Sequence, residues 1–462
     1  MTIWIPKLVP GTPKHRALAD AIAAAIVDGT LPAGTQMPPQ RELAFALGLS
    51  LGTVTRAYRS AEARGLLTGE VGRGTFVKGG AAPVGNVLFG PVRQSDDHIG
   101  LVMNLPPKVD AGARLEATLQ AIARDGSADF LVDHQVQGRI EAHARSATSW
   151  LQRVGLAAAP ENIVITNGAQ HGLLTALMTL ARPGDVILAE RLTYPALNQM
   201  AHCLGLKTQP VELDEEGLCP DSLDEACRRT GARVLYCMPT LHSPTGTTMS
   251  AERRGAIAAI ADRHDLQIIE DDVFGFLPED RPPPLAQLAP DRTIYVTSAS
   301  KCMAPGLRIG MMLVPARWRE TIRNVVQMSC WMPSPLTAEI VHRWIEDGTA
   351  DALNQSMRLE MSARLDMAHE TLGSAIATQL GLRFHLWLSL PDGWSEEAFV
   401  GAAAARGVKI AAGSLFLLKP SDASRHARIA LGYETDRTRL QRGLTVLAEL
   451  MATHPMPGPA IV

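Results

Sequence analysis

Lys301 is the residue of this sequence best suited to covalent chemistry. It ends the run S-A-S-K, after Ser298 and Ser300, and Arg308 follows seven residues later. A lysine that forms a Schiff base with an aldehyde must lose its proton easily, and a partly desolvated pocket favours that loss. Hydroxyl groups and an arginine nearby are suited to binding an anionic phosphate. The run alone is weak support, because most lysines lie on the solvated surface.

The elements around Lys301 are typical of an α/β domain. The run I-Y-V-T over Ile294–Thr297 predicts a short buried strand that ends just before the loop with the lysine. In open α/β sheets, ligands bind at the carboxyl edge of the strands. Helical stretches such as Ala169–Ala181 alternate with further strand-like runs, which predicts a doubly wound sheet. These runs are Ile163–Thr166, Val186–Ala189, Val234–Cys237 and Leu266–Glu270.

Three of the predicted strands are followed by residues that suit a planar, phosphorylated ligand. The turn Asn167-Gly168 opens a helix whose backbone N–H groups could bind a phosphate. Tyr194 could stack on a flat ring, although a lone tyrosine is more often part of a core. Asp271 ends a buried strand, where a carboxylate is costly without a partner. A protonated pyridine nitrogen would be one such partner, and capping of the next segment is the alternative.

With the run A-P-G-L-R-I-G after Lys301, these segments resemble the class I aminotransferases of fold type I, which bind pyridoxal 5′-phosphate (PLP). The resemblance extends from about Ile99 to the C-terminus. It implies catalytic roles for Lys301, Asp271 and Tyr194, and an α-carboxylate site at Arg428 in A-R-I-A-L-G-Y. Asn104, in N-L-P-P, matches the segment that closes over the substrate. The cofactor-binding residues that it implies are Ala169, Gln170, Tyr194, Ser243, Asp271, Ser298, Lys301 and Arg308.

Two positions depart from the pattern of that family. Ser243 stands in S-P-T-G where the family has an asparagine, and Phe274 stands where it has a tyrosine. Both usual residues donate hydrogen bonds to the 3′-oxygen of the cofactor, and their loss weakens its electronic tuning. A third departure is His134, near the place of a partner-subunit tyrosine. We therefore expect PLP binding without fast turnover.

The first eighty residues predict a separate small module. Helices are expected over Ala17–Val27, Arg41–Leu47 and Leu51–Arg64, and glycines or prolines separate them. Two short strands, Leu66–Thr68 and Thr75–Lys78, follow with glycines between them. Three helices and a hairpin make a winged helix-turn-helix. A small helical cap packed on an enzyme is the alternative.

Specific motifs favour DNA binding for this module. L-P-A-G-T-Q-M-P-P-Q-R-E-L-A, G-L-S-L-G-T-V-T-R-A-Y and G-R-G-T-F-V resemble the GntR-type DNA-binding domain over about residues 12–78. In such modules the third helix enters the major groove and the wing tracks the backbone or the minor groove. Leu51 and Gly52 depart from the pattern, which leaves base readout open. The residues implied to contact DNA are Arg41, Ser50, Thr53, Thr55, Arg56 and, on the wing, Arg73.

Charge and composition agree with an intracellular DNA-binding protein. Residues 1–80 hold nine basic and five acidic residues, a net charge of +4, against 35 and 42 in the rest, a net charge of −7. A basic module on an acidic body indicates a polyanionic partner. The six cysteines lack C-x-x-C spacing, which favours a reducing compartment and no metal site. No apolar run approaches the ~20 residues that span a bilayer, and no export signal is recognised. We expect a cytoplasmic protein.

The predicted architecture is a winged helix-turn-helix domain (1–78), a flexible linker (79–99) and an α/β, fold-type I PLP-binding domain (100–462). This combination resembles the MocR-type regulators. It implies a homodimeric transcription regulator that binds double-stranded DNA and senses an amino acid, an amine or PLP itself through a Schiff base at Lys301. Two alternatives stay open. One is an active aminotransferase with an appended DNA-binding domain, and the other is a regulator whose body has lost PLP and serves only as a scaffold.

Overall fold

The computed structural model describes residues 4–6, 13–27, 30–31, 34–63, 66–70, 74–77, 98–133, 137–376, 381–419 and 424–453. The chain divides into two compact units, Met1–Pro91 and Val92–Val462. Arg73, His134 and almost all of the predicted linker 79–99 lie outside the described residues.

The N-terminal unit has three helices and a two-stranded antiparallel sheet. Leu18, Ile22, Val54 and Tyr58 are buried in its core. Gly48 ends the second helix with φ +62°, a left-handed conformation that glycine adopts without strain. The elements agree with the predicted winged helix-turn-helix within a few residues at each end. They are α1 (Lys14–Val27), α2 (Gln40–Leu47), α3 (Leu51–Ala63), β1 (Leu67–Glu70) and β2 (Gly74–Val77).

The second unit is built on a seven-stranded sheet. Its strands pair in parallel except β12, which is antiparallel to both of its neighbours. All five strands predicted from the sequence are present, and each end lies within one residue of the prediction. In sheet order the strands are β4 (Ile163–Thr166), β12 (Gly310–Leu313), β11 (Thr293–Ser298), β10 (Gln267–Asp271), β9 (Val234–Cys237), β5 (Val186–Glu190) and β6 (Lys207–Val211).

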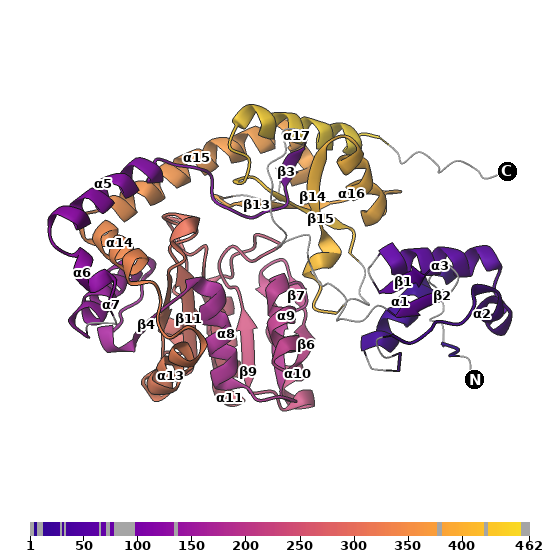
Figure 1. Ribbon diagram of the computed structural model, residues 1–462, viewed down its shortest axis with the longest axis horizontal. Helices are drawn as coiled ribbons and strands as arrows, with labels where there is room; N and C mark the ends of the chain where they lie inside the picture. Colours follow the sequence, from indigo (N-terminus) through magenta and orange to yellow (C-terminus); the bar gives the residue numbers. More distant parts are fainter. Residues whose placement is uncertain are drawn as a thin grey trace. The chain divides into compact units, whose positions relative to one another are not determined.

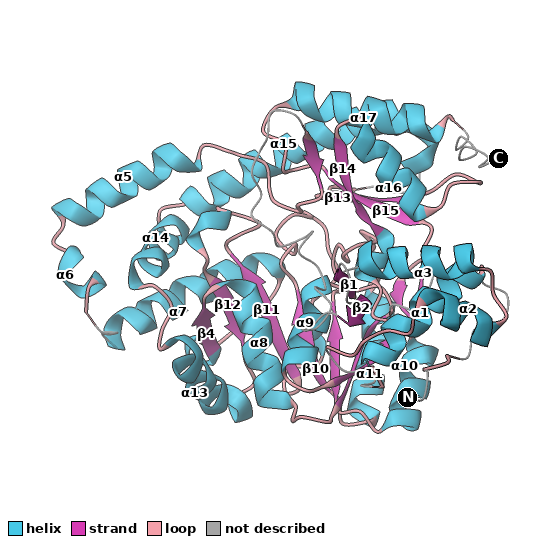
Figure 2. Ribbon diagram, turned by 45° about the vertical axis from the view of Figure 1, so that its right-hand side comes forward, coloured by secondary structure: helices cyan, strands magenta, loops and turns pink. Residues whose placement is uncertain are grey.

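Helices cover both faces of this sheet. One face packs against α8 (Gly168–Leu180), α9 (Pro195–Cys203) and α13 (Arg319–Cys330), and Figure 2 shows α8 and α13 on it. The opposite face packs against four other helices, which form two further apolar clusters. Burial on both faces explains why the central strands read as nearly continuous apolar runs. The four helices are α7 (Gln137–Leu151), α10 (Pro220–Thr230), α11 (Ala251–Arg263) and α14 (Pro335–Glu346).

A second, four-stranded sheet joins the beginning of this unit to its end. Its order is β13-β15-β14-β3, and β3 pairs in parallel with β14. Figure 1 shows β3, early in the chain and coloured indigo, among the yellow elements of the C-terminal part. The elements are β3 (Ile99–Leu101), α15 (Thr349–Leu372), β13 (His385–Ser389), α16 (Glu396–Ala405), β14 (Val408–Ala412), β15 (His426–Ala430) and α17 (Arg437–Met451).

The remaining elements are short or peripheral. None of the helices in the described ranges is long and apolar enough to cross a membrane. The remaining helices and strands are α5 (Ala111–Arg124), α6 (Ala128–Leu131), α12 (Leu285–Leu288), β7 (Leu213–Asp214) and β8 (Gly217–Leu218). The 3-10 turns are Gln152–Val154, Pro160–Asn162, Pro305–Leu307, Ala316–Trp318, Gly373–Ile376 and Gly413–Phe416.

Candidate functional site

Lys301 follows the carboxyl end of β11, where the strand–loop prediction placed it. Its ammonium group contacts the backbone oxygen of Asn104. Burial lowers the pKa of Lys301 to about 7, and the nearby Arg428 and Arg308 lower it further, against the opposite effect of Asp271. A large fraction of this amine is therefore unprotonated near neutral pH, which is the form that attacks a carbonyl carbon.

Asp271 ends β10 and is 2% exposed. Its Oδ2 accepts a hydrogen bond of 2.8 Å from the hydroxyl of Tyr236. Its Oδ1 is buried and has no hydrogen-bond partner of good geometry among the described residues. Burial raises the pKa of Asp271 to about 7, Asp272 also raises it, and the Tyr236 hydroxyl and the Val273 amide oppose the rise. A buried acceptor without a donor fits the ring N–H of a protonated pyridine.

The start of α8 and Arg308 together offer donors for an anion. α8 begins at Gly168, where a Cβ would lie 2.9 Å from a terminal nitrogen of Arg308. The guanidinium thus rests against the first turn of the helix, where the N–H groups lack intrahelical partners. Arg308 also donates to the Ser300 hydroxyl at 3.4 Å. Of the two residues assigned to the phosphate turn, Ala169 is buried and Gln170 is exposed. This arrangement fits a phosphate group.

Ser298 and Tyr194 lie at the same edge of the sheet. Ser298 is the last residue of β11 and is buried. Tyr194 immediately precedes α9, and burial raises its pKa to about 12. Its phenol is close enough to Asp271, Arg308 and Arg428 for their charges to affect that pKa. The ring of Tyr194 is therefore near the residues predicted to surround the cofactor.

Arg428 is a buried arginine on β15. One terminal nitrogen donates to the backbone oxygen of Val102 at 2.7 Å, and the other lies 3.5 Å from the Ser243 hydroxyl. Its guanidinium also lies 4.6 Å from the centre of the Phe416 ring. Nε has no partner in the part of the chain that the structure describes, and burial lowers the pKa of Arg428 to about 9. A carboxylate would satisfy this group.

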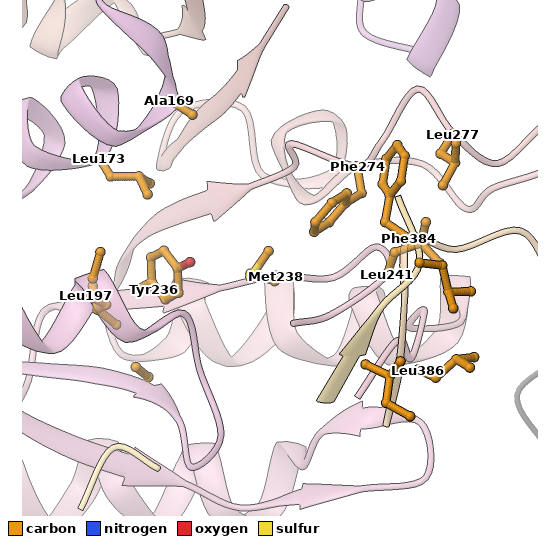
Figure 3. Close-up of a cluster of buried hydrophobic side chains, with 14 of the residues drawn as sticks. Ala169, Leu173, Leu197, Tyr236, Met238, Leu241, Phe274, Leu277, Phe384 and Leu386 are labelled. Carbon is orange, nitrogen blue, oxygen red and sulfur yellow. The ribbon is translucent and has the colours of Figure 1, made fainter. Parts of the chain in front are cut away.

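Phe274 is packed between other rings and cannot donate a hydrogen bond. Its ring centre lies 5.7 Å from that of Phe384 and 5.8 Å from that of His385. Figure 3 shows Phe274 and Phe384 beside each other in the buried cluster that also contains Tyr236. The nitrogen of Lys301 is 5.8 Å from the centre of the Phe274 ring. Phe274 therefore lines the surroundings of Lys301.

Two residues of this site were not singled out from the sequence, Tyr236 and His385. Tyr236 lies inside the predicted strand Val234–Cys237, where a phenol among apolar residues was the available signal. His385 is buried on β13, and its Nδ1 lies 2.9 Å from the amide nitrogen of Asn104. Nothing near His385 in the sequence marks it, because its neighbours in this site are about 140 and 280 residues away along the chain.

The predicted DNA-contacting residues of the N-terminal unit differ in exposure and in their hydrogen bonds. Arg41, Ser50 and Arg56 are exposed, and Arg56 donates only to the backbone oxygen of Gly52, at 3.3 Å, among the contacts described. Ser50 begins the helix, because its hydroxyl accepts from the Thr53 amide at 3.2 Å. Thr55 instead bridges two helices through a 2.7 Å hydrogen bond to Gln40.

Comparison with known proteins decides the family. Residues 98–440 match the model of the family described as aminotransferase class I and II, and residues 14–77 match bacterial regulatory proteins of the gntR family. The chain belongs to the class I and II aminotransferase family. Its N-terminal unit is a GntR-type helix-turn-helix, so the predicted MocR-type domain combination is confirmed.

Curated relatives match nearly the whole chain. The HTH-type transcriptional regulator YdeF of Bacillus subtilis is 29% identical over 97% of this chain and 96% of its own length. The HTH-type pyridoxine biosynthesis transcriptional regulator PdxR of Corynebacterium glutamicum is 29% identical over 86% of this chain and 87% of its own. The HTH-type transcriptional regulator TauR of Rhodobacter capsulatus is 29% identical over 88% of this chain and 90% of its own length.

Solved structures support the fold of the large unit. The kynurenine aminotransferase of Pyrococcus horikoshii has a TM-score of 0.71 at 24% identity, over 78% of this chain and 92% of its own. An archaeal alanine:glyoxylate aminotransferase has a TM-score of 0.71 at 23% identity, over 80% of this chain and 93% of its own. The predicted fold-type I architecture is therefore confirmed.

Proposed function

We propose that this protein is a cytoplasmic, DNA-binding transcription regulator that holds PLP at Lys301 and responds to an amino acid, an amine or PLP itself. The observation that carries the proposal is that one buried site contains both Lys301, with a pKa of about 7, and an Asp271 Oδ1 that has no partner among the described residues. The confirmed GntR-type module and the regulators among the relatives support the DNA-binding part. We propose the domains 1–78, 79–99 and 100–462 for DNA binding, linker and ligand binding.

The side chains at the carboxyl edge of the sheet can hold PLP in the following way. Arg308, Ser298 and the first turn of α8, with Ala169 and Gln170, bind the phosphate, and Tyr194 packs on the ring. Asp271 accepts a hydrogen bond from the ring nitrogen. When bound, PLP supplies an aldehyde carbon that can exchange one amine for another. Ser243 lies within reach of the cofactor's 3′-oxygen in this proposal.

Lys301 and Arg428 would give the site its response to amines. Because its pKa is near 7, Lys301 can take up or release a proton at cellular pH. Arg428 can bind a carboxylate of the effector, in exchange for its contacts with Val102 and Ser243. Asn104, which touches Lys301 through its backbone, would lie against the effector. An effector that makes different contacts in the free and DNA-bound states shifts the equilibrium between them.

For the N-terminal unit we propose that α3 enters the major groove of double-stranded DNA. Arg41 and Arg56 are exposed and charged, Ser50 immediately precedes α3, and Thr53 lies in its first turn. Such residues bind phosphates, and an arginine can also read guanine. Arg73 is proposed as the contact from the wing.

A second copy of the chain is the proposed partner of the large unit. Trp331 and Met328 are 60% and 69% exposed, and Trp331 lines a groove of about 840 Å³ with Ile140 and Pro333. Large exposed apolar side chains beside a groove mark interaction surfaces. Sedimentation equilibrium should give twice the chain mass, and Trp331→Glu should give a monomer.

An active aminotransferase is the second candidate, because Lys301, Asp271, Tyr194 and Arg428 are all in one site. Phe274, which lacks a hydroxyl, counts against fast turnover. A scaffold without cofactor is disfavoured by the same four residues. Steady conversion of a keto acid with an amino donor at rates of about 1 s⁻¹ or more would identify an enzyme.

Borohydride reduction of the protein with PLP, followed by peptide mapping, tests the central proposal. We expect the label on Lys301 and its loss in Lys301→Ala, while Lys409→Ala, at an exposed lysine of β14, keeps it. A label on another lysine, or no label with excess PLP, would refute the proposal.

A further inference from the structure

Asp271 and Asp272 lie side by side at the end of β10 but face opposite sides of the large sheet. On β10, Ile269 pairs with Tyr236 of β9, and Glu270 pairs with Tyr295 of β11. Side chains alternate along a strand. Asp271 therefore shares a face with Tyr236, and Asp272 shares the other face with Tyr295.

Each of these carboxylates receives one hydrogen bond from a fully buried tyrosine. The Tyr236 hydroxyl donates to Asp271 at 2.8 Å, and the Tyr295 hydroxyl donates to Asp272 at 2.6 Å. Asp272 is also paired with Arg281 at 2.6 Å. Asp271 forms no such ion pair among the described residues. The phenol of Tyr236 is thus the side-chain group that fixes the orientation of the Asp271 carboxylate.

Tyr236 stays a donor over the whole physiological range. Burial raises its pKa well above 10, and the charge of Asp271 raises it further. A protonated phenol that donates to a carboxylate stabilises the ionised form, and it opposes the effect of burial on the pKa of Asp271. The same bond occupies Oδ2 and leaves Oδ1 available to a ligand.

We propose that Tyr236 is a positioning residue that, through Asp271, keeps the ring nitrogen of bound PLP protonated. The inference rests on the proposed PLP binding and deepens it. With the phenol present, Asp271 is a weak enough base that the proton stays on the nitrogen. Without the phenol, Asp271 becomes a stronger base. The N–H bond of the ring then breaks, an O–H bond to Asp271 forms, and both groups become neutral.

The test uses the full-length protein loaded with PLP that carries ¹⁵N in the ring. In the wild type we expect the ¹⁵N chemical shift of a protonated nitrogen between pH 6 and 9. In Tyr236→Phe the shift should move toward that of a neutral nitrogen, and PLP should dissociate about tenfold more readily, as for a change of about one pKa unit. The variant Asp271→Asn gives the reference ¹⁵N chemical shift of the ring nitrogen when the carboxylate is absent.

Tyr295→Phe is a matched control. It removes an equally buried hydroxyl from the neighbouring carboxylate on the other face of the same strand. We expect a similar loss of thermal stability, an unchanged ¹⁵N shift and PLP affinity within about twofold of the wild type. Equal shifts in both variants would show a general disturbance of the sheet and would overturn the proposal.

A second variant keeps the proposal testable if Tyr236→Phe does not fold. Replacement of Tyr236 alone by 3-fluorotyrosine gives a more acidic phenol and a stronger donor. The ring nitrogen should then stay protonated to higher pH than in the wild type. A folded Tyr236→Phe protein, or the fluorinated one, with wild-type shift and affinity contradicts the role of Tyr236. If the wild type itself takes up no PLP at Lys301, the proposed function fails as well, which the borohydride label shows separately.

Discussion

The Nδ1 atom of His385 lies 2.9 Å from the amide nitrogen of Asn104, and this contact fixes which way the Asn104 carboxamide faces. The other ring nitrogen of His385 lies 3.3 Å from the backbone oxygen of His242, which can only accept. That nitrogen therefore carries the proton, and Nδ1 accepts from Asn104. The carboxamide oxygen of Asn104 is left buried without a partner among the described residues. It is an acceptor on the residue whose backbone oxygen contacts Lys301.

His385 should stay neutral, and this should appear in the pH dependence of stability. Burial lowers its pKa well below 6.5, and Arg428 lowers it further. Below about pH 6.5 the unfolded chain binds a proton that the folded chain does not, so the free energy of unfolding falls as pH falls. Denaturant titrations between pH 5 and 7.5 should show a smaller decrease in His385→Gln.

Lys301 should be the fastest-reacting lysine of the cofactor-free protein at neutral pH. With a pKa of about 7, its acylation rate should reach half of its maximum near pH 7, against about 10.4 for an exposed lysine. Arg308→Ala should raise that midpoint, because Arg308 lowers the pKa. Mass spectrometry after short pulses of acylating reagent gives the rate for each peptide. A midpoint above 9 would contradict the described environment of Lys301.

The lowered pKa of Lys301 should also make the stability of the cofactor-free protein depend on pH. Between pH 7 and 10.5 the unfolded chain holds a proton on Lys301 that the folded chain has lost. The cofactor-free protein should therefore gain stability as pH rises through this window, and Lys301→Met should remove that gain.

Phe274→Tyr and Ser243→Asn should restore donors that PLP enzymes of this family use. We expect each to lower the pH midpoint of the absorbance of the bound cofactor by about half a unit to one unit, from about 1 kcal/mol per hydrogen bond. Phe384→Tyr adds the same hydroxyl to the ring that packs on Phe274 and is the control. A wild-type midpoint as low as that of the double mutant would mean that another residue supplies the donor.

Arg56→Ala should weaken DNA binding uniformly and reduce its salt dependence. Each phosphate contact that is lost lowers the slope of log K against log salt by about 0.9. Arg41→Ala should behave alike if α2 touches the backbone. Lys14→Ala removes an equal charge from the exposed start of α1 and should leave the slope nearly unchanged. Titrations of labelled operator between about 50 and 200 mM salt give the affinity and the slope, because phosphate contacts affect binding in this range.

The strands of the large unit were predictable because both faces of the sheet are buried. Val234–Cys237 and Ile163–Thr166 are mostly apolar, and both were found with the predicted bounds. The antiparallel pairing of β12 with β4 was not predictable, since β4 ends 144 residues before β12 begins, from Thr166 to Gly310. A local pattern carries no information on such a neighbour.

The residues of the site were predictable where they follow a strand and not where they meet across the fold. Lys301 and Asp271 stand at strand ends that the sequence marks. Thr55, whose predicted approach to DNA stays a prediction, donates to Gln40, fifteen residues earlier, and that contact was not predicted. Asp271 is bound by Tyr236, and Asn104 is bound by His385. Both partners come from distant parts of the chain, so that only the tertiary structure shows them.

β3 has a consequence for how force could pass along this chain. The strand is held at the border of the small sheet by three paired residues, Ile99 to Leu101. Immediately after it, Val102 is tied to Arg428 and Asn104 to Lys301. A displacement of the backbone before Ile99 would therefore reach, within five residues, the contacts of Arg428 and Lys301, the two cations proposed to hold the effector. By thermodynamic reciprocity, an effector that strengthens or weakens these two contacts must change the free energy of such a displacement, and the displacement must change the free energy of effector binding by the same amount.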